Sequence, residues 1–256
     1  MKNLQTQIRL RDKYFFMYDF CLPDNNEEEL AGEYYRNKIK NVVFCYEVFD
    51  KNDLKYFKLN NILYYKKLNI FYCALINNED FKKSLEIANE LFYSNKYYND
   101  LIFVVGRDLN YNDKILSKYF LSGLLDPIKY DKKYLFGGIN YVSIKKIKED
   151  NLSILFSIKN LINNIEKFYA IKKFLEFAQK KYLNILIGSF AENKNEVPNR
   201  YHIYSFYKVL GIYYSLNYLN KIFKEQIIRI RLAKRKDYFT KGFYIIFYPY
   251  QDCREY

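Results

Sequence analysis

Short apolar runs alternate with amphipathic segments from about residue 68 onward. Continuous apolar runs of strand length predict buried strands at Asn69–Ile76, Leu101–Val105, Leu152–Ile158 and Leu183–Ile187, with a shorter strand at Lys133–Phe136. Apolar residues at helical spacing predict helices over 79–95, 112–122 and 164–181, and a long helix over about 203–235.

These strands recur roughly every 20–30 residues with helices between them, which is the spacing of βαβ units. Nearly continuous apolar strands indicate a sheet covered on both faces, as in parallel sheets. We therefore predict an α/β fold, a three-layer α/β/α sandwich with a mainly parallel five-stranded sheet of Rossmann-like or flavodoxin-like type. Ligands would bind beyond the carboxyl ends of its strands.

The first 60 residues are less regular. They contain an acidic, turn-rich break at 23–29 and one strand candidate at Val42–Phe49. We predict an N-terminal extension at 1–60, an α/β domain at 61–236 and a C-terminal tail at 237–256.

Composition changes this picture in two ways. The chain of 256 residues has 30 Tyr and 22 Phe but 8 Gly and no Trp, which is the bias of an A/T-rich genome. The aromatic content therefore carries little functional weight. The net charge of +13 indicates a polyanionic partner, with nucleic acid favoured over an anionic membrane surface.

The sequence offers little for a metal site. Cys21, Cys45, Cys73 and Cys253 are scattered without a CxxC pair, and His202 is the only histidine. We predict no metal and interpret the cysteines as reduced structural residues of a protein that is not secreted. The N-terminus lacks a secretory signal, and no apolar run approaches the roughly 20 residues of a membrane span.

Catalytic and cofactor motifs are also missing. Gly106 follows a strand, but the further glycines of a dinucleotide site and the Walker sequence are absent. Ser189 also ends a strand, without the Gly-x-Ser-x-Gly elbow of a hydrolase. We predict that the protein binds no cofactor and no small-molecule substrate and has no enzymatic activity.

Basic clusters are the better candidates for function. Three of nine arginines lie in the cluster Arg229, Arg231, Lys234, Arg235 and Lys236, and the arginine fork suits bidentate contact with phosphate. The other interpretation is a solvated helix end whose positive charge complements the helix dipole. The same alternatives hold for the clusters Lys66, Lys67 and Lys145, Lys146, Lys148.

Four stretches resemble universal small-subunit ribosomal protein 2, the bacterial S-two family. They are the strand and helix at 65–92, LIFVVGR at 101–107, KYLFGGINYVSIKKI at 133–147, and the strands and helix from 152 to 190 followed by Val197-Pro198-Asn199. The resemblance covers about residues 62–225. The early His-x-Gly-His motif of the family has no match, two of its strand-end aspartates are replaced, and its protruding helical hairpin is lost.

The resemblance implies a structural constituent of the small ribosomal subunit. Its partners would be small-subunit rRNA and neighbouring small-subunit ribosomal proteins, and the codon bias would suit a mitochondrial protein. The resemblance adds four further predicted RNA contacts to the basic clusters. Three lie in or near the Gly-Gly segment and one follows Val-Pro-Asn: Gly137, Gly138, Asn140 and Arg200. The alternatives are a Rossmann-like enzyme binding a nucleotide at the Gly106 edge, and a basic accessory subunit of an organellar membrane complex.

Overall fold

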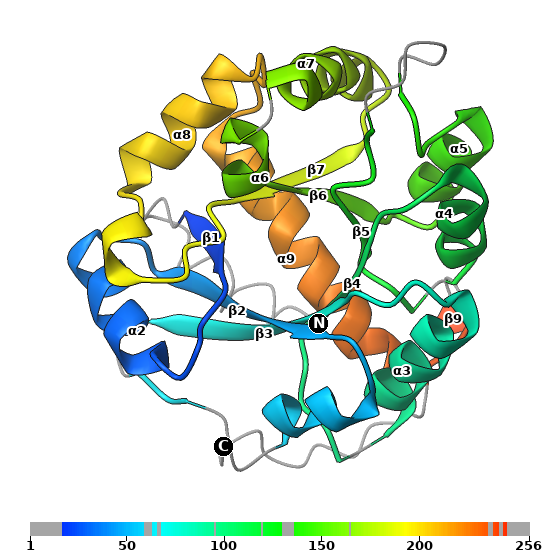
Figure 1. The fold of residues 1–256 in the computed structure, drawn as a ribbon, viewed down its shortest axis with the longest axis horizontal. Coiled ribbons are helices and arrows are strands. Elements are labelled where there is room, and N and C mark those ends of the chain that lie inside the picture. Colours follow the sequence, from blue (N-terminus) through cyan, green and yellow to red (C-terminus); the bar gives the residue numbers. More distant parts are fainter. Residues whose placement is uncertain are drawn as a thin grey trace.

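Seven parallel strands form one sheet with helices around it (Figure 1). The computed structural model describes residues 17–58, 63–65, 68–94, 96–118, 120–129, 136–163, 165–234, 238–240 and 243–244. The strands of the sheet are β1 (Tyr18–Cys21), β2 (Asn41–Val48), β3 (Asn69–Ile76), β4 (Leu101–Val105), β5 (Gly123–Leu125), β6 (Ser153–Ser157) and β7 (Asn184–Gly188).

Helices follow most of these strands. The α-helices are α2 (Glu27–Arg36), α3 (Phe81–Tyr93), α4 (Leu109–Leu116), α5 (Tyr141–Glu149), α6 (Ile158–Ile162), α7 (Ile165–Lys180), α8 (Arg200–Val209) and α9 (Leu216–Ala233). Two 3-10 helices, η1 (Lys51–Phe57) and η3 (Lys194–Glu196), lie in loops, and β8 (Tyr238–Thr240) pairs with β9 (Phe243–Tyr244) in a separate antiparallel hairpin.

The strand order follows the chain, from β1 beside β2 to β6 beside β7. Each crossover therefore advances in the same direction across the sheet. Right-handed crossovers that never reverse direction place their helices on one face only, whereas a doubly wound sandwich needs a reversal of strand order. The sheet consequently curls, with its helices on the outside.

The two edges of the curled sheet meet. Cys21 at the end of β1 forms a parallel bridge with Ala191, and the Phe190 amide donates to the Phe20 carbonyl at 2.8 Å. The rings of Phe20 in β1 and Phe103 in β4 are 6.4 Å apart. A flat sheet would separate strands three positions apart by about 14 Å. The fold is therefore an α/β barrel of seven strands.

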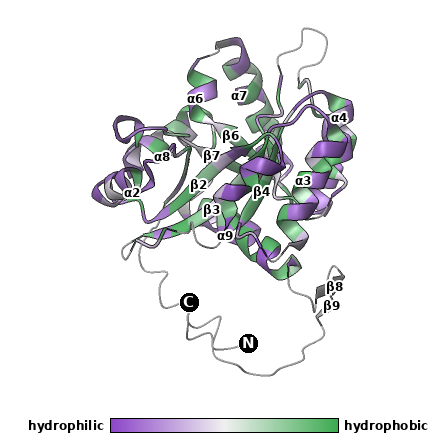
Figure 2. Ribbon diagram, turned by 60° about the horizontal axis from the view of Figure 1, so that its bottom comes forward, coloured by the Kyte–Doolittle hydropathy of each residue, from purple (hydrophilic) through white to green (hydrophobic). Residues whose placement is uncertain are grey.

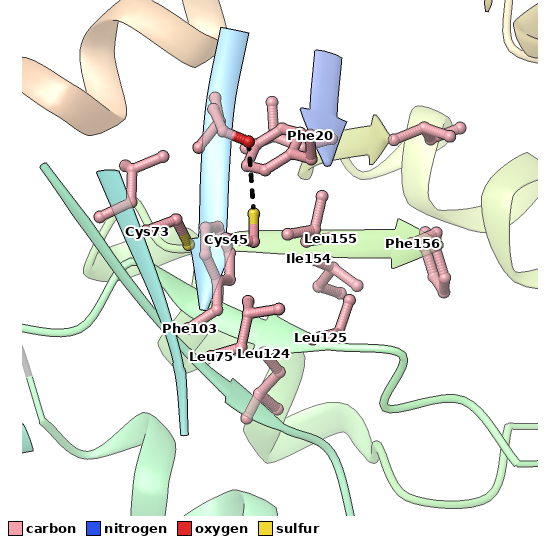
Figure 3. Packing of buried hydrophobic residues seen from close by; sticks show 14 of the residues in the cluster. Phe20, Cys45, Cys73, Leu75, Phe103, Leu124, Leu125, Ile154, Leu155 and Phe156 are labelled. Carbon is pink, nitrogen blue, oxygen red and sulfur yellow. Dashed lines mark hydrogen bonds between the residues drawn. The ribbon is translucent and has the colours of Figure 1, made fainter. Parts of the chain in front are cut away.

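The hydrophobic core draws residues from all seven strands, and Figure 3 shows part of it. Figure 2 shows mostly hydrophobic strands inside helices whose colour alternates along their length. That alternation is the amphipathic pattern expected of helices with one buried face.

Helix α9 crosses the end of the barrel where the strands begin (Figure 1). Its Phe223 ring stacks on Tyr18 at 4.5 Å and contacts Phe71 of β3 edge-on at 5.3 Å. The fully buried Gln226 donates to the carbonyl of Asn151, just before β6, at 2.7 Å. Helix α9 thus closes the amino-terminal end of the barrel.

The structure confirms an α/β fold with a parallel sheet and corrects its details. The sheet has seven strands rather than five, and its edges meet instead of forming a sandwich. Strands β1 and β2 belong to the sheet, so the predicted extension at 1–60 contains part of the barrel. The predicted helix at 203–235 is two helices, α8 and α9, because Gly211 at φ +77° breaks it.

The predicted strand at Lys133–Phe136 falls mostly outside the described residues. Within them, no helix is long and apolar enough to cross a membrane. The described cysteines, Cys21, Cys45 and Cys73, are buried and free of disulfides.

Candidate nucleic-acid interface

Paired aromatic and basic side chains line the outer surfaces of α7 and α8. The Lys173 ammonium lies over the Tyr169 ring at 5.6 Å, and Lys208 lies over Tyr204 at 4.8 Å. Residues four apart share one helix face, so each pair follows from its sequence spacing. We define the α7–α8 face as Tyr169, Lys173, Phe177, Lys181, Arg200, Tyr201, Tyr204 and Lys208.

Exposure and charge set this face apart. The side chains of Tyr169 and Tyr201 are 57% and 64% exposed. Residues 165–210, which contain α7 and α8, have eight Lys and Arg against four Asp and Glu, a net charge of +4. Exposed rings beside ammonium and guanidinium groups match the bases and phosphates of single-stranded nucleic acid.

Side-chain hydrogen bonds fix the ends of these helices. Asn199 is the N-cap of α8, and its side-chain oxygen accepts from the Tyr201 and His202 amides at 2.9 and 3.0 Å. The Gln179 side chain in α7 donates to the Gly211 carbonyl at 2.7 Å and accepts from the Tyr213 amide at 3.0 Å. Gln179 therefore ties α7 to the turn between α8 and α9.

A pocket of about 470 Å³ opens beside α8, at the carboxyl ends of β6 and β7. Its lining includes Ile158 and Ile162 of α6, Ile203 and Phe206 of α8, and Ser189 after β7. Its polar lining residues include Lys159, Asn163, Glu196 and His202. Lys159 forms ion pairs with Glu192 at 2.7 Å and Glu196 at 3.6 Å.

Behind Ser189 lies a buried carboxyl group at the seam between β1 and β7. Asp19 accepts from the Ser189 hydroxyl at 2.5 Å, from the Ser189 amide at 2.7 Å and from the Tyr34 hydroxyl at 2.8 Å. Complete burial raises the pKa of Asp19 to about 6, although each of these hydrogen bonds lowers it. The seam thus contains a group that titrates near neutral pH.

Arg107 occupies another part of the same end of the barrel. Its guanidinium donates to the Asn78 carbonyl and the Asn77 side-chain oxygen, each at 3.1 Å, and pairs with Glu79 at 3.5 Å. A Cβ on Gly106 would come within 2.3 Å of the Pro127 backbone, so close packing explains this glycine without a phosphate.

Several solved structures match this chain, and one of them covers nearly all of it. A protein chain in the "cryo-EM structure of archaeal Ribonuclease P with mature tRNA" superposes with a TM-score of 0.69 and 19% sequence identity, covering 91% of this chain and 100% of that chain. The likeness establishes the fold. No protein-family model matches the sequence, and no curated protein matches it significantly.

The described members of the predicted arginine cluster, Arg229, Arg231 and Lys234, hydrogen-bond to other parts of the protein. Arg231 donates to the buried Asp100 carboxylate at 2.6 and 2.9 Å, and Arg229 donates to the carbonyl of Leu121. Lys234 donates to the Asn99 side chain at 2.6 Å, and burial lowers the pKa of Lys234 to about 8. These cations attach α9 to the loops before β4 and β5.

The Gly-Gly segment is also used within the fold. Gly138 has φ +90°, and a Cβ there would lie 2.2 Å from the Pro127 carbonyl oxygen. The Gly137 carbonyl accepts a hydrogen bond from the backbone amide of Lys129 at 2.8 Å. Asn140 caps α5 in a reciprocal pair with Ser143. A turn and a helix start account for all three residues.

The predicted lysines of α5 differ in their surroundings. Lys145 is exposed and pairs with Glu149 at 3.8 Å, whereas Lys146 donates to the Asp113 carbonyl at 3.0 Å and Lys148 is exposed. Arg200 is exposed at the start of α8 and belongs to the α7–α8 face. Lys66, Lys67, Arg235 and Lys236 lie outside the described residues.

Sequence reasoning missed most of the α7–α8 face. Lys173, Lys181 and Lys208 each follow an aromatic residue by four positions, a signal visible once the helices are placed. The aromatic residues were attributed to codon bias, which hid the pattern. Within the described residues, no group of three or more His, Cys, Asp or Glu side chains is placed to hold a metal ion.

Proposed function

We propose that this protein is an RNA-binding, non-catalytic subunit of a ribonucleoprotein and contacts RNA through the α7–α8 face. The observation that carries the proposal is the repeated lysine-over-aromatic pairing on that face, within residues 165–210 of net charge +4. Lysines neutralise phosphates, and the exposed rings of Tyr169 and Tyr201 on this face offer bases a stacking surface.

The structural neighbour supports the choice of particle. It is a protein chain in a structure of archaeal Ribonuclease P with mature tRNA, and it aligns with this chain over its full length. A ribonucleoprotein of the Ribonuclease P type is therefore the assembly that we favour. The charge of +13 agrees with a partner rich in phosphate.

The mouth of the barrel supports a non-catalytic role. Enzymes with closed α/β barrels carry catalytic residues at the carboxyl ends of the strands. Here Arg107 is held by Asn77 and Asn78, and the nearly buried Asp126 accepts from the Ser157 amide at 3.1 Å and the Asn160 side chain at 2.7 Å. In the part of the barrel mouth that the structure describes, Arg107 and Asp126 are thus hydrogen-bonded to other groups of the protein.

A place in the small ribosomal subunit, next to its rRNA and ribosomal proteins, is the second candidate. The observation in its favour is the sequence resemblance over LIFVVGR, GGINY and VPN. Both candidates need the same basic surface and differ in the RNA that it meets. The mitochondrial location stays a prediction that rests on codon bias.

The experiment is crosslinking of the tagged, full-length chain to RNA in its own cells, followed by RNA sequencing. We expect one stable structural RNA to be enriched, with crosslinks on α7 and α8. Small-subunit rRNA would select the ribosomal candidate instead. Recovery of the chain without RNA would refute both and leave the nucleotide-binding enzyme and the membrane-complex subunit.

A further inference from the structure

The pocket beside α8 has the shape and chemistry of a small binding site. Helices α6 and α8 supply apolar walls through Ile158, Ile162, Ile203 and Phe206, and Ser189 comes from the end of β7. Its volume of about 470 Å³ falls within the roughly 300–1,000 Å³ of small-molecule sites. Apolar walls with a few polar lining groups suit a flat ring bearing hydrogen-bonding atoms.

Charge argues against a phosphate inside this pocket. Lys159, its cationic side chain, is engaged by Glu192 and Glu196 at 2.7 and 3.6 Å. Asp19 lies directly behind Ser189, whose hydroxyl it binds at 2.5 Å. A dianionic group would face these carboxyl groups, whereas a neutral ring would not.

The basic surface begins at the rim of the pocket. His202 lines the pocket, and Arg200 and Tyr201 precede it on the first turn of α8. The Arg200 guanidinium stacks on the Tyr201 ring at 4.6 Å, and both side chains are exposed. A nucleotide with its base in the pocket would have a cation close by for its phosphate.

From this arrangement we infer that the pocket between α6 and α8 accepts one unstacked nucleobase, with the phosphate of that nucleotide outside near Arg200. The inference deepens the proposed function, because the base would come from a single-stranded part of the bound RNA. A free nucleotide is the other source with the same chemistry.

The only histidine of the chain reports on the pocket directly. Selective labelling gives one set of His202 ring signals in the NMR spectrum of the full-length protein. We expect saturable shifts on addition of adenosine or uridine 5′-monophosphate and none with ribose 5-phosphate, which lacks the base. Absent shifts, or equal shifts with ribose 5-phosphate, would overturn the pocket assignment without requiring any variant to fold.

A matched pair of variants shows whether the base in the pocket comes from bound RNA or from a free nucleotide. Ile162, 64% exposed, lines the pocket, and Ile228, 46% exposed, lies on α9 outside its lining. We expect Ile162→Asp to abolish the nucleotide-induced shift and to weaken single-stranded RNA binding about tenfold, in the range of one lost stacking contact. Duplex RNA binding should be unchanged, and Ile228→Asp should behave like wild type.

The outcomes distinguish this inference from the proposed function. RNA binding that depends on the α7–α8 lysines but not on Ile162, without nucleotide shifts, would overturn the pocket and leave the proposed function intact. Nucleotide shifts lost in Ile162→Asp, with RNA binding unchanged, would overturn RNA as the source and assign the pocket to a free nucleotide. Absence of RNA binding by wild type would refute the proposed function.

Discussion

Arg231 on α9 is half-exposed but forms an ion pair with a buried carboxylate. Its guanidinium pairs with Asp100, a carboxylate that is 1% exposed and also accepts from the Tyr72 amide at 3.0 Å. We expect Arg231→Ala to lower the free energy of unfolding by about 2 kcal/mol, because it leaves a buried charge with fewer partners. Urea denaturation measures this change.

The control is Arg36→Ala on α2. Arg36 is 66% exposed and pairs with Glu33 at 2.7 Å, three residues earlier on the same helix. Exposed pairs of this kind contribute about 0.5 kcal/mol. Equal losses for the two variants would show that Arg231 is an ordinary surface side chain and would return it to the predicted phosphate contacts.

Asp19 makes stability depend on pH. Burial raises its pKa from 3.8 to about 6 in the folded state, so the folded protein holds this proton more tightly than the unfolded chain. Stability should therefore fall as pH rises from about 4 to 6, by about 3 kcal/mol for two pKa units.

Asp19→Asn isolates this effect, because asparagine does not titrate. The wild type should lose stability relative to Asp19→Asn between pH 4 and 7, although asparagine accepts fewer of the hydrogen bonds from Ser189 and Tyr34. Denaturation at several pH values gives the difference. A constant difference across this range would contradict a buried, titrating carboxyl at the seam.

At the scale of elements, α9 closes the amino-terminal end of the barrel. Phe223 is 2% exposed and contacts rings of β1 and β3. We expect Phe223→Ala to cost about 3–5 kcal/mol of stability, the usual result of removing a buried ring. Thermal and urea denaturation measure the loss.

Tyr64→Ala is the comparison for this variant, since the Tyr64 side chain is 82% exposed. A surface substitution of this kind should stay within about 0.5 kcal/mol of wild type. If Phe223→Ala costs no more than Tyr64→Ala, α9 does not close the barrel in solution.

Elements were predictable where the apolar pattern was long enough. The predicted strands at 69–76 and 101–105 coincide with β3 and β4. Strand β5 has three residues, too few for a pattern. Its Gly123 has φ +149°, and a Cβ there would lie 1.7 Å from the Ser153 carbonyl oxygen, so the position requires glycine. Helix α5 escaped prediction even though Asn140 and Ser143 form its capping pair.

Long-range contacts explain the other differences. The seam joins Asp19 to Ser189, 170 positions apart, and no local pattern reveals that the edges of the sheet meet. The α9 arginines were predicted to contact phosphate because arginine is scarce in the sequence. Their partners, Asp100 and Leu121, lie on distant loops, so no local pattern reveals these contacts. Conversely, the i, i+4 pairs of α7 and α8 are local and were present in the sequence throughout.

At the scale of the whole molecule, the barrel separates its charges by position. The Arg229, Arg231 and Lys234 side chains, at the carboxyl-terminal part of α9, hydrogen-bond to the loops before β4 and β5 at the amino-terminal end. The α7–α8 face presents its cations on the outer wall. The same net charge therefore serves folding at one end and, in our proposal, RNA binding on the wall.

The salt dependence of RNA affinity shows whether the α7–α8 face binds RNA phosphates. The test variant is Lys173→Gln, Lys181→Gln, Lys208→Gln, and the control, with equal charge loss, is Lys58→Gln, Lys82→Gln, Lys83→Gln at exposed positions on and near η1 and α3. Fluorescence anisotropy with an RNA that has a stem and a single-stranded end is measured at several salt concentrations. We predict weaker binding by the test variant and a plot of log affinity against log salt that is shallower by about two. The control should keep the wild-type slope. Equal slopes for the two variants would contradict an RNA-binding α7–α8 face.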